Sequence, residues 1–231
     1  MDCAFYLIQF IFFDIIYQHT DSIGGFNREQ MYIFITSYLF IDALNMTFFA
    51  NNIWWFPRIV NKGELDYYLI RPVSALFFLS LREFAANSFI NLLISFSLVI
   101  WSLSNYSGEI STLGIILYFC LLFNGLFIHY ILNFFFVLSS LWTNSASGNL
   151  DLFYSLSHAC ERPDLIYQGK IRFLFLYILP FALIASFPVR VLFEKNYSFL
   201  ILQSLLTSAI LFLILIYFWS RGLRRYNSAS S

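Results

Sequence analysis

The distribution of Lys and Arg along this chain constrains its fold more than any other feature. Ten of the thirteen basic residues fall into three clusters, and long runs rich in Phe, Leu and Ile separate the clusters. With 60% hydrophobic and 11% charged residues, the chain has too little polar surface to cover a soluble domain of 231 residues. The sequence therefore predicts an all-α, polytopic membrane protein with a single transmembrane domain over residues 1–231.

Six apolar runs are candidates for membrane segments. Crossing a hydrocarbon core of ~30 Å takes roughly 20 helical residues, and four of the runs have that length. Two are shorter and irregular, because one contains Asp14 and the other contains Pro180. The first run lacks the basic region and cleavage site of a signal peptide, so we expect a retained helix. The predicted segments cover residues 4–17, 31–56, 84–103, 113–141, 173–187 and 197–219.

The basic clusters also predict an orientation. If the N-terminus is cytoplasmic, two inner loops and the tail (220–231) contain ten basic residues, which leaves only Arg28, Arg190 and Lys195 outside. This ten-to-three bias agrees with the positive-inside rule, so both termini are expected in the cytoplasm. The ten predicted inner residues are Arg58, Lys62, Arg71, Arg82, Arg162, Lys170, Arg172, Arg221, Arg224 and Arg225.

A few polar residues interrupt the apolar runs. An ionisable side chain at membrane depth usually faces a cavity or a partner, which makes Asp14, Asp42 and His129 candidates for lining a pathway. Asn124 lies in the same run as His129 and is a further candidate. A structural role remains open, because the acids can lie near an interface and His129 can bond a neighbouring helix.

Several kinds of chemistry are missing from the sequence. There is no Gly-x-x-x-x-Gly-Lys-Ser/Thr phosphate loop, so ATP-driven work requires another polypeptide. No nucleophile motif indicates an enzyme. The three Cys residues do not suggest a disulfide framework, and the three His residues lack the spacing of metal ligands. We expect neither a metal nor a nucleic-acid partner.

The first inner loop, residues 57–78, has the features of a short helix beneath the membrane. Gly63 permits a sharp exit from the preceding helix, and Glu64 and Asp66 suit a first helical turn. Pro72 ends the short helix, with Arg71 at its C-terminal end. The loop is either a docking site for a partner or a solvated face lying on the lipid surface.

The second inner loop, residues 150–172, shows a similar pattern. Polar residues from Asp151 to Arg162 recur at helical spacing against apolar ones and precede Pro163. This pattern predicts an amphipathic helix at the inner interface, with the same two interpretations.

Three separated motifs carry a family resemblance. The first inner loop reads Gly-Glu-Leu-Asp-x-x-Leu-x-Arg-Pro-Val, and the tail reads Trp-x-x-Gly-Leu-x-x-Tyr-x-Ser from Trp219 to Ser228. Between them come Arg162-Pro163, Ile166-Tyr167, Pro180-Phe181-Ala182 and Phe187-Pro188. The chain thereby resembles the six-helix permease subunits of type 2 ABC exporters, in an uncharacterised branch of the ABC-2 family.

The resemblance implies a membrane subunit of a bacterial inner-membrane pump. Its partners would be ABC ATPase subunits, which bind ATP and Mg²⁺, a second identical or homologous permease, and membrane lipids; no cofactor is expected in this chain. The substrate path would run between the permeases, lined mainly by the second and fifth membrane segments. Residues 180–196 would form a short outer re-entrant segment, with Pro180, Phe187 and Pro188 as candidates for an external gate. The implied ATPase-coupling residues are Gly63, Glu64, Leu65, Asp66, Arg71 and Pro72.

The sequence thus favours export driven by a partner ATPase. A signalling or anchoring subunit that moves no cargo is an alternative, although such subunits usually carry a large external domain, and the predicted outer loops are short. A secondary transporter is a third hypothesis, which needs coupled ionisable residues such as Asp42 and His129 at mid-depth.

Overall fold

The computed structural model describes residues 2–143, 147–194 and 196–226. Every regular element in these ranges is a helix, which confirms the predicted all-α class. The α-helices are α1 (Asp2–Tyr17), α2 (Arg28–Asn45), α3 (Asn51–Asn61), α4 (Asp66–Leu69), α5 (Ala75–Ser80), α6 (Phe89–Ser104), α7 (Thr112–Leu138), α8 (Ser147–Ser157), α9 (Gly169–Phe173), α10 (Ala182–Phe193) and α11 (Ser198–Leu223). Short helical turns are η1 (Met46–Ala50, a π-helical turn), η2 (Ala86–Ser88), η3 (Ser139–Leu141), η4 (His158–Glu161), η5 (Asp164–Ile166) and η6 (Leu174–Ile178, also π-helical).

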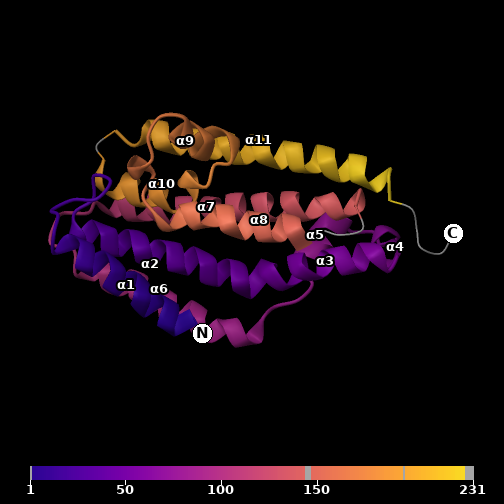
Figure 1. The fold of residues 1–231 in the computed structure, drawn as a ribbon, viewed down its shortest axis with the longest axis horizontal. Coiled ribbons are helices and arrows are strands. Elements are labelled where there is room, and N and C mark those ends of the chain that lie inside the picture. Colours follow the sequence, from indigo (N-terminus) through magenta and orange to yellow (C-terminus); the bar gives the residue numbers. More distant parts are fainter. Residues whose placement is uncertain (1, 144–146, 195, 227–231) are drawn as a thin grey trace.

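The long helices lie side by side along the longest axis of the molecule, and the connections collect at two ends (Figure 1). We call one the Gly24 end; it comprises residues 18–27, 105–111 and 162–168. The other is the Lys62 end, which comprises residues 62–74, 139–143 and 224–226. The continuous helix α2–η1–α3 runs from the first end to the second, and α11 ends near the second.

Four helices are long and apolar enough to cross a membrane: 28–61, 86–104, 112–141 and 198–223. They confirm the four long predicted segments. The first predicted segment is the shorter apolar helix α1. The chain is therefore a multi-pass membrane protein.

Polar residues mark where two of the membrane helices begin. Asn27 caps α2, because its side chain accepts from the Gln30 backbone N–H at 2.9 Å while the Gln30 side chain accepts from the Asn27 N–H at 3.0 Å. The Ser111 hydroxyl accepts from the Gly114 N–H at 3.0 Å and caps α7. These reciprocal and single caps satisfy backbone donors that the helix itself leaves unpaired.

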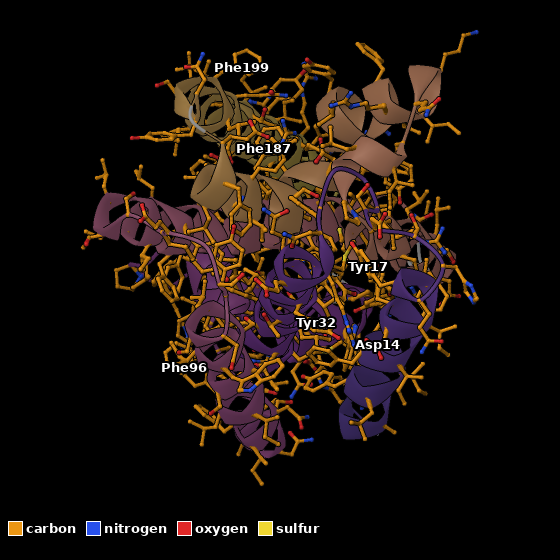
Figure 2. The ribbon with its side chains drawn as sticks, turned by 90° about the vertical axis from the view of Figure 1, so that its left-hand side faces the viewer. Asp14, Tyr17, Tyr32, Phe96, Phe187 and Phe199 are labelled. Carbon is orange, nitrogen blue, oxygen red and sulfur yellow. The ribbon has the colours of Figure 1, made fainter. Side chains whose placement is uncertain are left out.

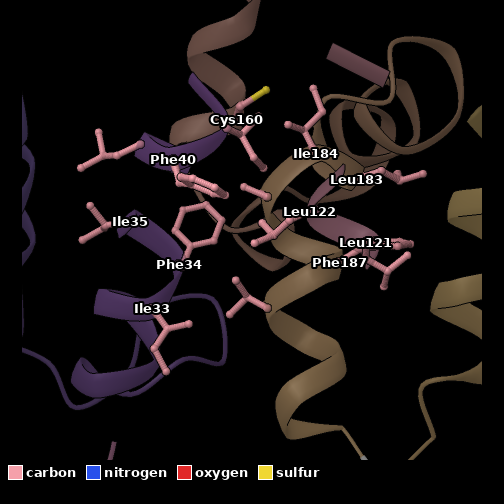
Figure 3. Packing of buried hydrophobic residues seen from close by; sticks show 14 of the residues in the cluster. Ile33, Phe34, Ile35, Phe40, Leu121, Leu122, Cys160, Leu183, Ile184 and Phe187 are labelled. Atoms are coloured by element: carbon pink, nitrogen blue, oxygen red, sulfur yellow. The ribbon is translucent and has the colours of Figure 1, made fainter. Parts of the chain in front are cut away.

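The core lies where α2, α7 and α10 meet (Figure 3). Phe34 of α2, Leu122 of α7 and Ile184 of α10 are fully buried there. The closest approach is at Gly125, where a Cβ atom would overlap the backbone carbonyl oxygen of Ile184. A small residue at this position lets two helix backbones touch, as is common in membrane bundles.

Replacing Gly125 with Ala should therefore push α10 away from α7. The obstacle is backbone rather than a movable side chain, so we expect a loss of roughly 1–3 kcal/mol, typical of overpacking. The measurement is the thermal midpoint of the purified protein. Gly148→Ala is the matched control, since nothing lies within 4 Å of its Cβ position. Equal midpoints for the two variants would contradict the close packing of α7 against α10.

Residues 150–172 do not lie where the sequence suggested. Helix α8 packs antiparallel to α7, with Phe153 fully buried between His129 and Phe136 at ring distances of 5.6 Å. The chain then reaches the opposite end, because Pro163 and Ile166 lie about 3 Å from the Cβ position of Gly24. The segment thus crosses the bundle from the Lys62 end to the Gly24 end, instead of lying along one surface.

The predicted segment 173–187 is not one continuous helix. The α9–η6 and α10 helices are bent by 94° about Pro180, so they form either a broken span or a re-entrant loop. Both of its outer ends belong to the Gly24 end: Phe193 of α10 contacts the rings of Phe26 and Tyr106 at 6.5 and 5.0 Å, and Arg172 of α9 lies 3.5 Å from Asp164. The hairpin therefore begins at Gly169, earlier than the predicted stretch 180–196.

This rearrangement changes the charge count. Five described basic residues lie toward the Gly24 end, namely Arg28, Arg162, Lys170, Arg172 and Arg190, while seven lie toward the Lys62 end. Lys195, which was predicted to be external, lies outside the described residues. The ten-to-three bias of the sequence becomes a nearly even distribution, because Arg162, Lys170 and Arg172 change ends.

Candidate functional site

A cavity of about 160 Å³ lies inside the bundle between α2, α7 and the α8–η4 segment, and its wall combines apolar surface with several polar side chains. Phe5 of α1 and Met46 of η1 contribute apolar atoms to its wall. Two of the predicted pathway residues, Asp42 and His129, meet here although 87 positions separate them in the sequence. The polar lining consists of Tyr38, Asp42, His129, Tyr154, Ser157, His158, Cys160 and Glu161.

The cavity lies at mid-depth. Asp42 is 14 residues (42 − 28) beyond the first residue of α2, which corresponds to about 21 Å along the helix from the Gly24 end. Another 19 residues (61 − 42) separate it from the end of α3. This depth is where an ionisable group is costly unless it faces a polar space, so the cavity accounts for the Asp42 carboxylate.

Glu161 is the acid that the sequence analysis did not single out. Its carboxylate accepts from the Gln9 amide at 3.1 Å and lies 2.6 Å from His158 Nδ1 and 3.5 Å from the Tyr38 hydroxyl. The Glu161 side chain is only 17% exposed, whereas that of His158 is 71% exposed at the mouth. Only the path of α8–η4 through the bundle brings this acid to Asp42, so no local sequence pattern could have identified it.

His129 differs from the other polar residues of the wall. It is 6% exposed and makes no hydrogen bond to any described residue. One face of its imidazole stacks on the Phe153 ring at 5.6 Å and 28°. The interhelical hydrogen bond that was the alternative interpretation of His129 is not present among the described residues, and the ring borders the cavity.

The other two predicted pathway residues lie elsewhere. Asp14 is at the Gly24 end, where it accepts from the Tyr32 hydroxyl at 2.7 Å and forms an ion pair with Arg28 (Figure 2). Asn124 joins α7 to α11, donating to the Ser208 hydroxyl at 2.9 Å and accepting from the Ser204 hydroxyl at 2.8 Å. Both residues therefore have structural partners and do not line the cavity.

The turn at Gly63 ends the long helix at the Lys62 end. Gly63 has φ = 72°, and its N–H donates to the Val60 carbonyl at 3.1 Å. The Glu64 N–H donates to the Ile59 carbonyl at 3.0 Å. This pair of bonds is a Schellman motif, in which a residue with positive φ reverses the chain and glycine is favoured.

Arg71 and Leu65 hold the predicted coupling loop in shape. Leu65 is fully buried, while the Arg71 guanidinium lies 4.6 Å from the Phe78 ring centre and 5.7 Å from that of Tyr68. Pro72 is exposed between α4 and α5. Such stacking on aromatic rings orders an otherwise exposed loop.

The same loop exposes an apolar surface, the Tyr67 patch, consisting of Tyr67, Ile70 and Val73. These side chains are 68%, 81% and 50% exposed. Glu64 and Asp66 are half-buried beside them, and Lys62 lies 3.8 Å from Glu64. The charges of this loop were evident from the sequence, whereas its apolar centre was not predicted, although apolar centres with charged rims are typical of docking surfaces.

An ion-pair cluster holds the hairpin α9–η6–α10 at the Gly24 end. Asp164 is fully buried, 2.7 Å from Arg190 and 3.5 Å from Arg172, and its backbone N–H donates to the Ser186 hydroxyl at 2.9 Å. Burial raises the pKa of the Asp164 carboxyl, and the two Arg residues oppose that shift. Arg190 also contacts Glu194 at 2.6 Å.

The three predicted gate residues are all buried within this hairpin. Pro180 is at the bend, and the backbone carbonyl oxygen of its neighbour Phe181 lies 3.5 Å from Cys160 Sγ. Phe187 is 2% exposed and has Arg190 over its ring at 5.4 Å. Pro188 is buried in α10. In the described arrangement these residues belong to the packing of α10 against the bundle.

No group of three or more His, Cys, Asp or Glu side chains within the described ranges could hold a metal ion.

Comparison with known proteins gives one match. A family model described as "ABC-2 family transporter protein" matches residues 3–230, which is nearly the whole chain. No curated protein and no solved structure matches.

Proposed function

Because this chain belongs to the ABC-2 family of transporter proteins, it is a permease subunit of an ABC transporter, and we propose that it exports a substrate using ATP hydrolysed by separate subunits. Substrate would pass through the mid-depth cavity between α2 and the α8–η4 segment. ATP and Mg²⁺ would be bound by the partner ATPase. The chain itself contains no phosphate loop.

One observation carries this proposal. The continuous helix 28–61 has Asp42 and Met46 in the cavity wall, and it ends directly at the Gly63 turn. A movement of the loop would therefore reach the cavity through one rigid element. Coupling between distant sites requires a physical connection of this kind.

The ATPase would bind at the Lys62 end. Its contact surface would be the Tyr67 patch with Glu64, Asp66 and Arg71 at the rim, and α4 would act as the coupling helix. A second permease, identical or homologous, would complete the path, which makes the cavity wall formed by α2 and α8 part of the interface. Lipid would cover α6 and α11, whose apolar side chains are extensively exposed, including Ile90, Leu93, Leu202 and Leu213.

The hairpin at the Gly24 end would serve as the external gate. Its bend reaches the level of Cys160, beside the cavity, while both of its ends stay at the Gly24 end. Moving the hairpin would open the cavity on that side. We place Pro180, Phe187 and Pro188 in this gate because they lie at its bend and in its packed face.

We further propose that the Lys62 end and both termini are cytoplasmic, in the bacterial inner membrane. Support comes from the coupling-loop motif, since the nearly even charge distribution no longer favours one side strongly. In a Cys-free background, Asn105→Cys should react with a membrane-impermeant maleimide added outside, and Lys62→Cys should not. Efficient external labelling at position 62 would overturn this orientation and the coupling role with it.

The purified chain should neither bind nor hydrolyse ATP. Co-expression with its ATPase should give a stable complex in which hydrolysis responds to the permease. ATP turnover is measured on the homogeneous permease and on the complex. Hydrolysis by the permease alone would refute the division of labour that we propose.

A secondary transporter and a signalling subunit make different predictions. Ion-coupled transport would need Asp42 and His129. Uptake driven by an ion gradient alone, measured in vesicles that contain the Asp42→Asn or the His129→Gln variant, therefore tests the secondary-transporter hypothesis. ATP-dependent transport with no response to an ion gradient supports the exporter. ATP-dependent signalling without substrate movement would support the non-transporting alternative.

A further inference from the structure

We propose that a second cavity, between the hairpin α9–η6–α10 and α11, binds a phosphate diester such as the head group of a membrane phospholipid. This cavity has a volume of about 340 Å³ and shares no lining residue with the mid-depth cavity. The inference goes beyond the proposed function and does not depend on it. The evidence is a pair of unpaired donors in the wall, the charge around them and the depth of the site.

Two buried donor atoms belong to residues of this wall and have no hydrogen-bond partner among the described residues. They are Nε of Arg172, on α9, and Nε2 of Gln203, on α11. Buried polar atoms without a partner are rare in native proteins. Both atoms can only donate, so each requires an acceptor. An occupant with several acceptor oxygens would satisfy both and would link α9 to α11.

The charged side chains that line the cavity are basic. Arg172 and Arg190 line it, and no Asp or Glu does. Arg190 is already bound to Asp164 at 2.7 Å and to Glu194 at 2.6 Å. Arg172 has only Asp164, at 3.5 Å, which is beyond the range of a strong hydrogen bond. Its guanidinium therefore has donors available, and guanidinium groups bind phosphate oxygens well. Since the two acids offset much of the charge, a singly charged diester fits better than a doubly charged monoester.

The depth of the cavity matches the position of lipid head groups. Helix α11 has 26 residues and is therefore about 39 Å long, close to the ~40–45 Å of a bilayer with its head-group regions. Gln203 is 5 residues (203 − 198) beyond the start of α11, or about 7.5 Å along it. A hydrocarbon core of ~30 Å leaves roughly 5–7 Å for the head groups on each side. Gln203 thus lies near the boundary between head groups and acyl chains.

The rest of the wall is mostly apolar and is open at the surface. Phe187 and Phe199, both labelled in Figure 2, belong to it together with Phe173 and Tyr177. Phe173, Tyr177 and Phe199 are 57%, 56% and 66% exposed, so acyl chains can lie against them. A Tyr at the level of the head groups is typical of membrane proteins. These side chains favour a lipid over a free phosphate compound as the source of the diester.

Phosphatidylglycerol tests this proposal, with diacylglycerol of the same acyl chains as its counterpart without phosphate. Binding is measured by native mass spectrometry of the full chain in uncharged maltoside micelles. We expect phosphatidylglycerol to bind at least about tenfold more tightly than diacylglycerol, and Arg172→Gln to remove most of this preference. Lys170→Gln is the matched control, because Lys170 is an exposed base on α9 that does not line the cavity.

Gln203→Met gives a second variant that does not disturb the ion pairs. It removes the unpaired Nε2 donor and keeps the length of the side chain, so the hairpin should stay folded. Binding of phosphatidylglycerol should weaken about threefold or more. Wild-type affinity in this variant would contradict the proposal.

The remaining outcomes are equally decisive. Equal binding of the two lipids would overturn the proposal without any variant. Equal losses in Arg172→Gln and Lys170→Gln would also overturn it, since they would show a general attraction of an anionic lipid to basic side chains. Competition with glycerophosphoglycerol, the same head group without acyl chains, distinguishes the source of the diester. Displacement at similar concentrations identifies a soluble phosphate compound, and retained lipid identifies a phospholipid; both results keep the phosphate site.

Discussion

Replacing Arg190 with Ala should release the hairpin α9–η6–α10 and expose Cys160. The substitution removes the 2.7 Å partner of the fully buried Asp164, which then keeps only Arg172 at 3.5 Å. Breaking a buried ion pair from one side costs about 3–5 kcal/mol, because the remaining charge is left poorly solvated. At about 3 kcal/mol, the open state would become more populated by roughly a hundredfold.

Cys160 reports this opening directly. Its thiol is buried against the Phe181 carbonyl near the bend of the hairpin. With Cys3 and Cys120 replaced by Ala, the rate of maleimide labelling should rise about a hundredfold in Arg190→Ala. The control is Arg162→Ala, an exposed Arg at the same end with no ion pair among the described residues. Adding Asp164→Asn should restore most of the protection, since the fully buried charge is then removed, while Glu194 and Arg172, which also lose their partners, are 38% and 39% exposed. Unchanged labelling in Arg190→Ala would show that the ion pair does not anchor the hairpin.

Reversing both Glu64 and Asp66 to Lys should weaken binding of the ATPase by roughly thirtyfold or more. These acids are half-buried beside the Tyr67 patch, so docking would desolvate them further. An exposed rim pair contributes only ~0.2–1 kcal/mol, but an unpaired charge at a desolvated joint costs about 2–5 kcal/mol. The measurement is the affinity of the purified complex, together with ATP turnover per transported substrate.

Asp21→Lys with Glu109→Lys is the matched double reversal. Both acids are exposed at the Gly24 end and have no close basic partner among the described residues. This control should assemble normally, and both double variants should insert into the membrane. If both double variants lost ATPase binding equally, the Gly63 loop would be a solvated turn without a docking role. The proposed coupling would then have no physical basis.

Local chemistry was sufficient to predict the long helices and the turn at the Lys62 end. A run such as 113–141 has no alternative to a membrane helix, because its backbone must satisfy its own hydrogen bonds in lipid. The Gly63 turn was equally predictable, since a positive φ favours glycine and the preceding helix must end there. In both cases the determining interactions lie within a few residues.

The path of residues 150–172 was not predictable in this way. An amphipathic helix lying on a surface and one packed inside a bundle beside a cavity share the same periodicity. Nothing in the local sequence shows whether Phe153 is buried in the bundle or faces lipid, because its ring partners His129 and Phe136 belong to α7. The length of the segment also favoured the wrong prediction of a surface helix, because residues 147–161 are too few to resemble a membrane span.

The cavity was predictable only in part from the sequence. Asp42 and His129 were identified singly, because charge at depth is costly wherever the helix sits. Their meeting with Glu161 depends on three helices far apart in sequence. Asp14 had the same local signature as Asp42, yet the tertiary fold gives it Arg28 and Tyr32 at the Gly24 end.

The π-helical turn Met46–Ala50 gives the long helix a built-in rotational offset. A π turn holds about one residue more than an α turn, and each residue advances a helix by ~100°. The face of α3 is therefore turned by about that angle relative to where an unbroken α-helix would present it. Deleting one residue between Met46 and Ala50 would remove the residue that the wider turn accommodates, so the turn could close with α-helical geometry. The two halves would then keep their present phase: Asp42 would stay in the cavity wall, and Phe56 would stay buried against Phe134 and Trp219.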